Sequence, residues 1–436
     1  MPEPGAFLGR GECVSAMDKD RFPGRLPAGG RSAPALMPCE LPPGAPREFN
    51  MAKCAVIALL FISTIGPQST TDRALPFDKN WQLSGAQTSI VKDGGREVLQ
   101  VESGLAERRD VRFENGTIDF DVQVTRRRSF VYLYFRVASD GEREEIYLRP
   151  HKSSLPDALQ YAPVWQDRSS WQLYHGPRGT AAVAFEPGTW MHVRLVVQGR
   201  HGAVFVNDMT KPAMLIPHFA REPEPGYIAF GSFVPAGVGG SAPSARFANV
   251  IVRHDAVSFD VKGAIADAAA QRPGAQSAGT VRAWSVSQAF VPKESEPPVY
   301  PDASVLGQFR RLETDPDGLL ELHRYVKVPE KSSVTAAVAR FRVVAGKAAT
   351  SAFDLGFSDV VTVFVNGQPV FRGDASYSFD RPRREGLIGF DQARLYVPLR
   401  PGDNEIAVVV TDSFGGWGVM GRFVSPEGLT LVDTGS

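Results

Sequence analysis

Short runs of alternating hydrophobic and polar residues make up most of the chain after Trp81. Between Trp81 and His254 these runs are bounded by Gly, Asp, Asn and Pro, and they lack the 3.6-residue period of a helix. Many short strands at regular spacing indicate a β-sandwich or a jelly roll. The clearest predicted strands are 97–102, 117–125, 129–137, 145–149, 171–175, 181–185, 190–197, 203–207, 226–231 and 245–252.

The alternation also assigns side chains to faces, because successive strand residues point to opposite sides of a sheet. The apolar positions expected to face the core are Ile118, Phe120, Val122, Val124, Val131, Leu133, Phe135, Val137, Ile146 and Leu148. The positions expected to share the opposite face of two of these strands are Tyr132, Tyr134, Arg136, Glu145, Tyr147 and Arg149. If those strands are neighbours, that face carries phenols, carboxylates and guanidinium groups, whereas an ordinary solvent face carries more Lys, Ser and Thr.

The segment 143–175 is the richest in planar and charged side chains. We expect a strand, then a long loop, then a second aromatic strand at 171–174. The candidate ligand-binding residues in and beside this segment are Tyr132, Tyr134, Tyr147, Arg149, His151, Asp157, Gln160, Tyr161, Trp165, Trp171 and Tyr174. Aromatic rings stack on the apolar side of a pyranose, while Arg, Asp and Gln form bidentate hydrogen bonds with neighbouring hydroxyls. The alternative is a loop held by its own hydrogen bonds, with Trp165 and Trp171 covering the sandwich edge.

A second series of predicted strands begins at about Val281. The small and polar residues at 259–280 are expected to form an interdomain linker with one or two helical turns at most. The predicted strands of the second series are 318–328, 333–344, 350–357, 360–365, 393–398, 405–411 and 418–423. The pair Asn366 and Gly367 favours a tight hairpin between two of them.

The start of the chain has a different character. Residues 1–50 are rich in Pro, Gly and Ala, which indicates a disordered leader or a misassigned start with Met51 as the true first residue. Residues 51–69 combine Lys53, a short apolar run and a small, polar exit, as in a secretory signal peptide. A membrane anchor is the alternative, but the run is short for a span of about 20 residues. We expect a secreted, periplasmic or cell-surface protein with no transmembrane segment after signal removal.

Charge and cysteine content exclude several classes of function. The 48 basic residues balance the 48 acidic residues, so nothing indicates nucleic acid or an anionic membrane surface as a partner. The three cysteines, Cys13, Cys39 and Cys54, all lie near the N-terminus. A disulfide scaffold and a Cys-ligated zinc site are therefore excluded for the body of the chain.

Two parts of the chain resemble known families. The run W-M-H-V-R-L-V-V-Q-G-R-H-G-A-V-F-V-N-D at 190–208 and the run A-R-F-A-N-V-I-V at 245–252 resemble late strands of concanavalin A-like (laminin G-like) lectin and glucanase sandwiches. This resemblance covers about 81–254. The elements V-N-G at 365–367 and P-G-D-N-E-I at 401–406 resemble, in that order, the galactose-binding-like jelly roll that accompanies many glycoside hydrolases. The resemblances imply an exported glycan-handling protein whose second domain is an accessory, supporting or sugar-binding part.

No residue is assigned a catalytic role. The run Asp119-Phe-Asp-Val-Gln123 has the alternate carboxylate spacing of retaining glucanases, but Gln123 stands where a titratable group is needed. His151 and Asp157 suit a structural role better than a general base or a metal ligand. A structural calcium ion is compatible with such sandwiches, although no Asp-rich loop identifies its ligands, and no other cofactor is expected. The G-x-G-x-x-G match at 416–421 precedes a strand-like run instead of a helix, which argues against a dinucleotide site.

The predicted fold class is all-β, with two antiparallel β-sandwich or jelly-roll domains joined by a short linker. We expect the first domain at 75–258, the linker at 259–280 and the second domain at 281–436. The predicted function is an exported carbohydrate-binding protein that recognises a polysaccharide or surface glycan through the first domain. The alternatives are a glycoside hydrolase or polysaccharide lyase that uses the concave face of that domain, and a structural or adhesive surface protein.

Overall fold

The computed structural model describes residues 73–432, except 86, 139–140, 241–242, 256, 258, 271–277, 294, 297, 330–333 and 379–384. The predicted leader at 1–50, the predicted signal peptide at 51–69 and part of the predicted linker lie outside the described residues. The described part consists mainly of antiparallel strands in four sheets, which confirms the all-β fold class. None of the described helices is long and apolar enough to cross a bilayer.

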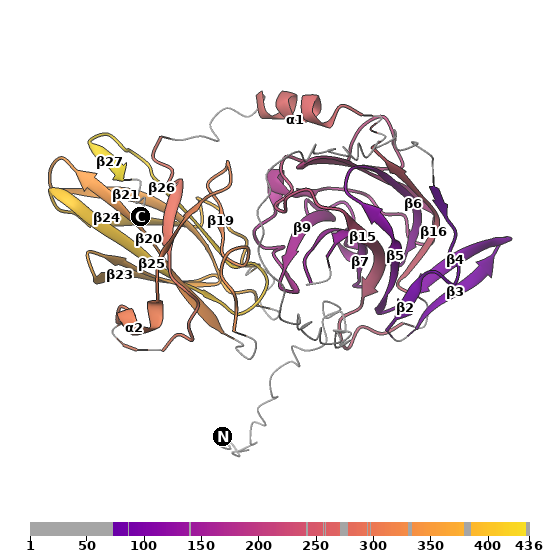
Figure 1. The fold of residues 1–436 in the computed structure, drawn as a ribbon, viewed down its shortest axis with the longest axis horizontal. Coiled ribbons are helices and arrows are strands. Elements are labelled where there is room, and N and C mark those ends of the chain that lie inside the picture. Colours follow the sequence, from indigo (N-terminus) through magenta and orange to yellow (C-terminus); the bar gives the residue numbers. More distant parts are fainter. Residues whose placement is uncertain are drawn as a thin grey trace, which may run out of the picture.

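Two sheets built from residues 73–254 enclose one hydrophobic core (Figure 1). Sheet A has the strand order β14 (Met214–Ile216), β13 (His201–Val206), β12 (Met191–Gln198), β6 (Gly116–Val124), β16 (Ala245–His254), β4 (Arg96–Val101), β3 (Thr88–Asp93), with β1 (Arg73–Leu75) beside β16. Sheet B has the order β10 (Arg168–Ser169), β9 (Leu159–Trp165), β8 (Arg143–Leu148), β7 (Phe130–Val137), β15 (Gly226–Phe233), β5 (Gly104–Phe113), β2 (Gln82–Ser84), with β11 (Thr180–Ala181) beside β9. Phe120 of β6 and Phe230 of β15 meet edge to face across this core, 5.0 Å apart.

The predicted alternation is confirmed in β6, β7 and β8 with one exception. Every predicted core residue of these strands lies in the core between sheets A and B except Val137. Arg136 has a φ of +50°, and the pairing of β7 with β15 shifts register beside it. Val137 therefore packs on the opposite face, beside Tyr134. The prediction that Arg136 shares that face is wrong, because its guanidinium donates to the Glu114 and Gly199 carbonyls instead.

The segment after β8 also differs from the prediction. Residues predicted as loop form β9, which pairs with β8 over six residues, and the predicted strand at 171–174 is a turn. Leu159, Tyr161 and Trp165 alternate along β9 and fill the core, which is why this run is a strand. Pro163 interrupts the apolar pattern and obscures it in the sequence. The true loop is short and contains the 3-10 helix Pro150–Lys152.

Residues 283–432 form two further sheets around a second core. Sheet D has the order β18 (Arg310–Glu313), β17 (Ala283–Val286), β20 (Thr335–Ala345), β25 (Gly402–Asp412), β22 (Val360–Val365), β23 (Gln368–Asp374), with β27 (Leu429–Val432) beside β20. Sheet C has the order β19 (Leu320–Glu321), β26 (Gly418–Phe423), β21 (Ala349–Ser358), β24 (Ala393–Leu399). Trp284 and Phe341 meet edge to face in this core, 5.0 Å apart.

Two predictions for this half have different outcomes. The predicted hairpin at Asn366 and Gly367 joins β22 to β23, and both residues have the positive φ that a tight type I′ turn needs. The predicted strand at 318–328 is reduced to the two residues of β19, followed by turns. The described residues also include α2 (Ala303–Leu306) and the 3-10 helix Gly176–Arg178.

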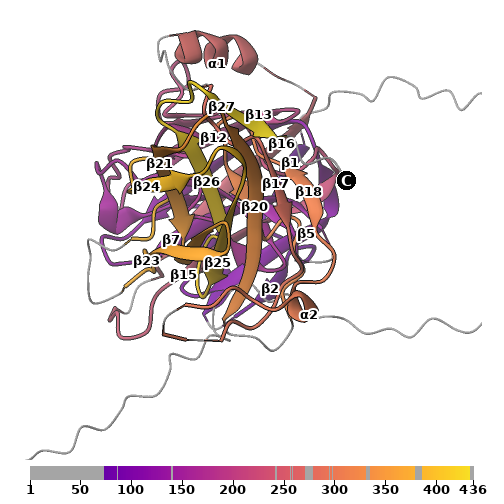
Figure 2. The same cartoon turned by 90° about the vertical axis from the view of Figure 1, so that its left-hand side faces the viewer.

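The first described part of the predicted linker is a helix. α1 (Val261–Ala270) packs Val261 and Ile265 against Val196, Ala203 and Phe205 on the outer side of sheet A. Figure 2 shows α1 beside β12 and β13. This stretch therefore belongs to the surface of the first sandwich instead of hanging free between the two.

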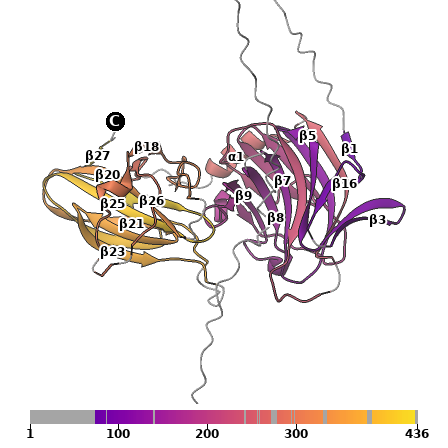
Figure 3. The ribbon, with the colours of Figure 1, turned by 60° about the horizontal axis from the view of Figure 1, so that its bottom comes forward.

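The two sandwiches lie side by side, with β9 of the first directed toward β19 and β26 of the second (Figures 1 and 3). Gln166, in the turn after β9, donates to the carbonyls of His323 (2.9 Å) and Val326 (3.0 Å). Its side-chain oxygen accepts from the Val328 amide at 3.0 Å. Tyr174 donates to the Glu321 carboxylate at 2.9 Å, and both groups are fully buried. Polar groups of the first sandwich are thus hydrogen-bonded to groups of the second.

Close backbone approach completes this contact. Gln172 accepts from the Gly416 amide at 2.8 Å, and a Cβ atom at Gly415 or Gly416 would collide with Gln172 or Leu173. The Gly-rich run that resembles a nucleotide motif therefore serves packing between the sandwiches. Leu319, Ile388 and Met420 of the second sandwich extend the core of the first.

The buried Glu321 predicts a specific pH dependence of stability. Burial raises its pKa from 4.5 to about 7, only partly offset by the hydrogen bond from Tyr174. The unfolded chain ionises this carboxyl near pH 4.5 while the folded chain keeps the proton, so stability falls as pH rises from about 4.5 to about 7, by roughly 3 kcal/mol in all. Glu321→Gln keeps an oxygen for Tyr174 and removes the charge. By scanning calorimetry, we expect this variant to have a higher melting temperature than the wild type at pH 8 and the same melting temperature at pH 4.

Glu313 provides the control, because it is exposed and paired with Arg311 at 2.9 Å. Glu313→Gln is expected to leave the pH profile of the melting temperature unchanged. A Glu321→Gln variant that melts below the wild type at pH 8 would contradict the assigned cost of this buried carboxylate.

Candidate functional site

The side of sheet B that faces away from the core carries most of the candidate residues, and we call it the tyrosine face. Strand register builds it in rows across β5, β15, β7, β8 and β9. One row runs Glu107, Ala229, Tyr134, Glu145, and the next runs Gly231, Tyr132, Tyr147, Gln160. The sequence prediction that Tyr132, Tyr134, Glu145, Tyr147 and Arg149 share one face is therefore confirmed.

Small residues on β15 make room for the rings. Gly231 stands opposite Tyr132, and Ala229 stands opposite Tyr134. The Tyr132 and Tyr134 rings stack with centroids 5.1 Å apart at 10°, and Tyr132 lies 5.3 Å from Tyr147. Such aromatic arrays present flat apolar area with polar hydroxyl tips.

Arg149 organises the polar part of the tyrosine face. Its guanidinium donates to the Tyr147 hydroxyl at 2.7 Å and to the Gln160 side-chain oxygen. Gln160 in turn donates to the backbone carbonyls of Trp171 and Tyr174, both at 2.7 Å. The guanidinium also lies 5.5 Å from the centre of the Trp171 ring. Arg149 therefore joins Tyr147 of β8 to the turn that holds Trp171.

The remaining loop candidates support this arrangement. Asp157 pairs with both Arg149 and Lys152, and its pKa lies below the usual value because the Lys152 hydrogen bond and the two cations outweigh its burial. The Nδ1–H group of His151 donates to the Ser129 carbonyl at 3.2 Å. Burial and the nearby Arg128 lower the pKa of His151 to about 4, so the ring is neutral at physiological pH.

Burial divides the tyrosine face into two zones. Tyr134, Glu145, Tyr147, Arg149 and Gln160 are more than nine-tenths buried. Five of the half-buried aromatic residues at its edge form what we call the aromatic rim: Phe130, Tyr132, His151, Trp171 and Tyr377. The rim is more exposed than the buried zone, which holds the rim in position from behind.

Both sandwiches contribute to the aromatic rim. Phe130 lies 5.3 Å from the His151 ring. Tyr377, from the second sandwich, meets Trp171 edge to face at 5.7 Å. Arg128 of the first sandwich donates to the Tyr377 hydroxyl at 3.3 Å. The rim therefore exists as a unit only while the two sandwiches are in contact.

Three of the predicted ligand-binding residues do not join the tyrosine face. Tyr161, Trp165 and Tyr174 lie in the core of the first sandwich. The Tyr161 hydroxyl donates to the Glu144 carboxylate at 2.7 Å and accepts from the Ala220 amide at 2.8 Å. Alternation along β9 explains the division, because Gln160 points to the tyrosine face and Tyr161 to the core.

Two members of the aromatic rim were absent from the sequence prediction. Phe130 has the same strand parity as Tyr132, so the alternation itself contained the signal. Tyr377 had no such signal, because it lies outside the strands of the second sandwich and meets Trp171 only through tertiary contact.

The carboxylates of β6 lie elsewhere. Asp119 is buried in sheet A, where it accepts from Arg194 at 2.7 Å and also pairs with Arg253. Asp121 accepts from the Asn249 side chain at 2.6 Å and lies 2.8 Å from His192. These ion pairs occupy the carboxylates, which favours a structural role. Among the described residues no group of three or more His, Cys, Asp or Glu side chains is arranged to hold a metal, and a calcium site stays a prediction.

No protein-family description and no curated protein matches the chain. Among solved structures it is similar to the carbohydrate-binding module CBM66 from Bacillus subtilis, at 10% identity and a TM-score of 0.30, covering 40% of this chain and 96% of that one. It is similar to a Bacillus licheniformis beta-glucanase, at 11% identity and a TM-score of 0.34, covering 43% and 100%. A Bacillus subtilis protein of unknown function with a galectin-like fold shares 12% identity at a TM-score of 0.31, covering 40% and 90%. The galactose-binding-like resemblance of the second half stays a prediction.

The two zones predict opposite responses to truncation. Tyr161→Ala removes a fully buried ring and two hydrogen bonds from the core, and we expect a loss of about 3–5 kcal/mol in the free energy of unfolding. Trp171→Ala removes a half-buried ring and is expected to cost much less. Urea titration followed by circular dichroism measures both. Equal losses would contradict the division between buried zone and rim.

Proposed function

We propose that this chain is an exported carbohydrate-binding protein that recognises a polysaccharide or surface glycan through the first sandwich. The observation that supports this most is the aromatic rim, set on a tyrosine face that also carries guanidinium, carboxylate and amide groups. Rings of this kind suit the apolar face of a pyranose, and the hydroxyl tips of Tyr132 and Tyr377 suit its hydroxyls. Export rests on the signal-like segment at 51–69.

The contact would be made by the rim. The Arg149 guanidinium lies 5.5 Å from the Trp171 ring and 5.1 Å from the Tyr147 ring, so it supports the back of a surface on which a sugar ring stacks against Trp171. Rings fixed by hydrogen bonds and packing lose little conformational freedom on binding, which favours affinity. Tyr377 extends the same surface onto the second sandwich.

Glycan cleavage is the second candidate, because burial raises the pKa of Glu145 on the tyrosine face to about 7. A carboxyl group with that pKa could act as a general acid near neutral pH. The other carboxylate of its row, Glu107, is three strands away, which corresponds to about 14 Å at the usual strand spacing. Paired glycosidase carboxylates stand about 5–9.5 Å apart. The two carboxylates are therefore too far apart for two-carboxylate hydrolysis, and this favours glycan recognition over cleavage.

Truncation of the rim tests recognition. Tyr132→Ala and Trp171→Ala are each expected to weaken retention on a bound polysaccharide about tenfold, since a stacked ring contributes about 1.4 kcal/mol. Affinity electrophoresis of the full chain through gels that contain a panel of polysaccharides measures retention, and the melting temperature is recorded in parallel.

Trp190→Ala is the matched control. Trp190 is also half-buried, but it lies next to sheet A, where its ring packs against Arg96 at 4.3 Å. Retention that is unchanged in the two rim variants, or reduced equally in Trp190→Ala, would exclude the rim as the binding surface.

The cleavage alternative has its own test. Recognition without cleavage predicts that the wild-type chain releases neither reducing ends nor unsaturated sugars from the same panel. Release that disappears in Glu145→Gln, with binding preserved, would replace recognition by catalysis as the primary function.

A further inference from the structure

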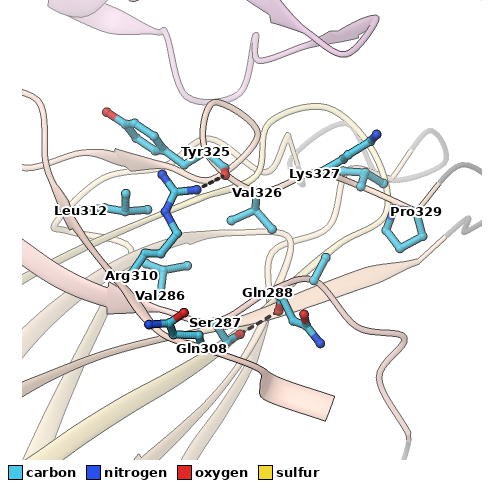
Figure 4. Close-up of a pocket in the computed structure, with 12 residues that line it drawn as sticks. Val286, Ser287, Gln288, Gln308, Arg310, Leu312, Tyr325, Val326, Lys327 and Pro329 are labelled. Atoms are coloured by element: carbon cyan, nitrogen blue, oxygen red, sulfur yellow. Dashed lines mark hydrogen bonds between the residues drawn. The ribbon is translucent and has the colours of Figure 1, made fainter. Parts of the chain in front are cut away.

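The second sandwich contains a pocket of about 500 Å³ that the proposed function does not use (Figure 4). Its walls come from the end of β17, from β18 and from the segment 325–329. The floor is apolar, with Val286, Leu312, Val326 and Val328 nearly fully buried. A volume of this size suits a ligand of one or two sugar rings.

The charged side chains that line the pocket are all basic. Arg310 and Lys327 line the pocket, and no Asp or Glu does. Among the described residues, the one hydrogen bond of the Arg310 guanidinium is to the Tyr325 carbonyl, at a long 3.5 Å (Figure 4). Neither cation forms an ion pair with the described residues. Two exposed cations around an apolar floor favour an anionic group that can accept several hydrogen bonds at once.

Neutral polar groups complete the lining. The amide side chains of Gln288 and Gln308 lie on the side opposite Tyr325. Gln288 donates to the Val305 carbonyl at 3.1 Å, which fixes its position. Amides offer both donor and acceptor, as neighbouring hydroxyls require. An apolar floor, two amides and two cations match a sugar that bears a carboxylate or a sulfate.

We propose that this pocket binds the acidic unit of an anionic saccharide, with Arg310 and Lys327 holding its carboxylate or sulfate. This site is distinct from the aromatic rim and does not depend on the function proposed for it. An oligoglutamate would use the two cations, but it has no pyranose ring to lie on the apolar floor.

The first sandwich shapes this pocket without lining it. The three hydrogen bonds of Gln166 hold the backbone of His323, Val326 and Val328, and the last two line the pocket. Gln166→Ala is therefore expected to weaken the binding of the anionic saccharide, although it removes no atom that lines the pocket. Every residue that lines the site belongs to the second sandwich, and the first sandwich fixes the backbone of two of them.

Calorimetric titration of the full chain tests the proposal with four probes. These are an oligogalacturonate, its neutral methyl ester, a sulfated oligosaccharide and oligoglutamate. Arg310→Gln and Lys327→Gln are each expected to weaken the anionic saccharide about tenfold, as loss of a charged hydrogen bond does. Arg311→Gln is the matched control, because this neighbouring arginine pairs with Glu313 at 2.9 Å and does not line the pocket.

Each outcome decides the proposal. Binding of the uronate, of the sulfated saccharide or of both, reduced in the two pocket variants and retained in Arg311→Gln, supports it and identifies the anion. No binding of either anionic saccharide, equal binding of the methyl ester, equal or tighter binding of oligoglutamate, or an equal loss in Arg311→Gln overturns it. Tyr132→Ala is expected to leave this binding unchanged, so failure here and failure of the aromatic rim are distinguishable.

Discussion

Several polar side chains of the segment from Gln166 to Tyr174 have their hydrogen-bond partners in the second sandwich. Gln166, Gln172 and Tyr174 each bond to a group of that sandwich, and the Tyr174 bond is fully buried. A buried donor or acceptor left without a partner costs about 1–3 kcal/mol. Docking of the two sandwiches is therefore a condition for this segment to hold its conformation. The aromatic rim and the wall of the pocket both depend on residues of this segment.

The same contact links the two proposed sites. On one side, Trp171 stands against Tyr377, so the aromatic rim crosses from one sandwich to the other. On the other side, Gln166 fixes the wall of the pocket in the second sandwich. A protein that recognises an extended glycan gains affinity when two sites hold a fixed separation. A rigid contact between sandwiches provides that separation better than a free linker.

Sequence reasoning was most successful where the signal was local. Alternation placed Tyr132, Tyr147 and Arg149 on one face, and the Asn366-Gly367 pair marked a hairpin, because both patterns depend only on neighbouring residues. Alternation failed at Val137, where a shift of register beside Arg136 reverses the faces.

Long-range contacts explain the other misses. The sequence does not reveal β9, because Pro163 interrupts its alternation and the residues on either side of Pro163 show no clear strand period. The partners of Gln166 and Trp171 lie more than 150 residues away in the chain, so no local pattern identifies them. Tyr161 is buried because alternation along β9 directs it into the first core, whereas Tyr174 is buried where it bonds to Glu321 of the second sandwich. Residue type alone made them resemble a sugar-binding cluster.

Amide hydrogen exchange of the full chain, with and without the polysaccharide it retains most strongly, tests the central claim most directly. A glycan held by the aromatic rim is expected to slow exchange in peptides that contain Phe130 to Tyr132, Trp171 and Tyr377, which means in both sandwiches at once. Slowing confined to one sandwich, or located away from the rim, would contradict a recognition surface shared by the two.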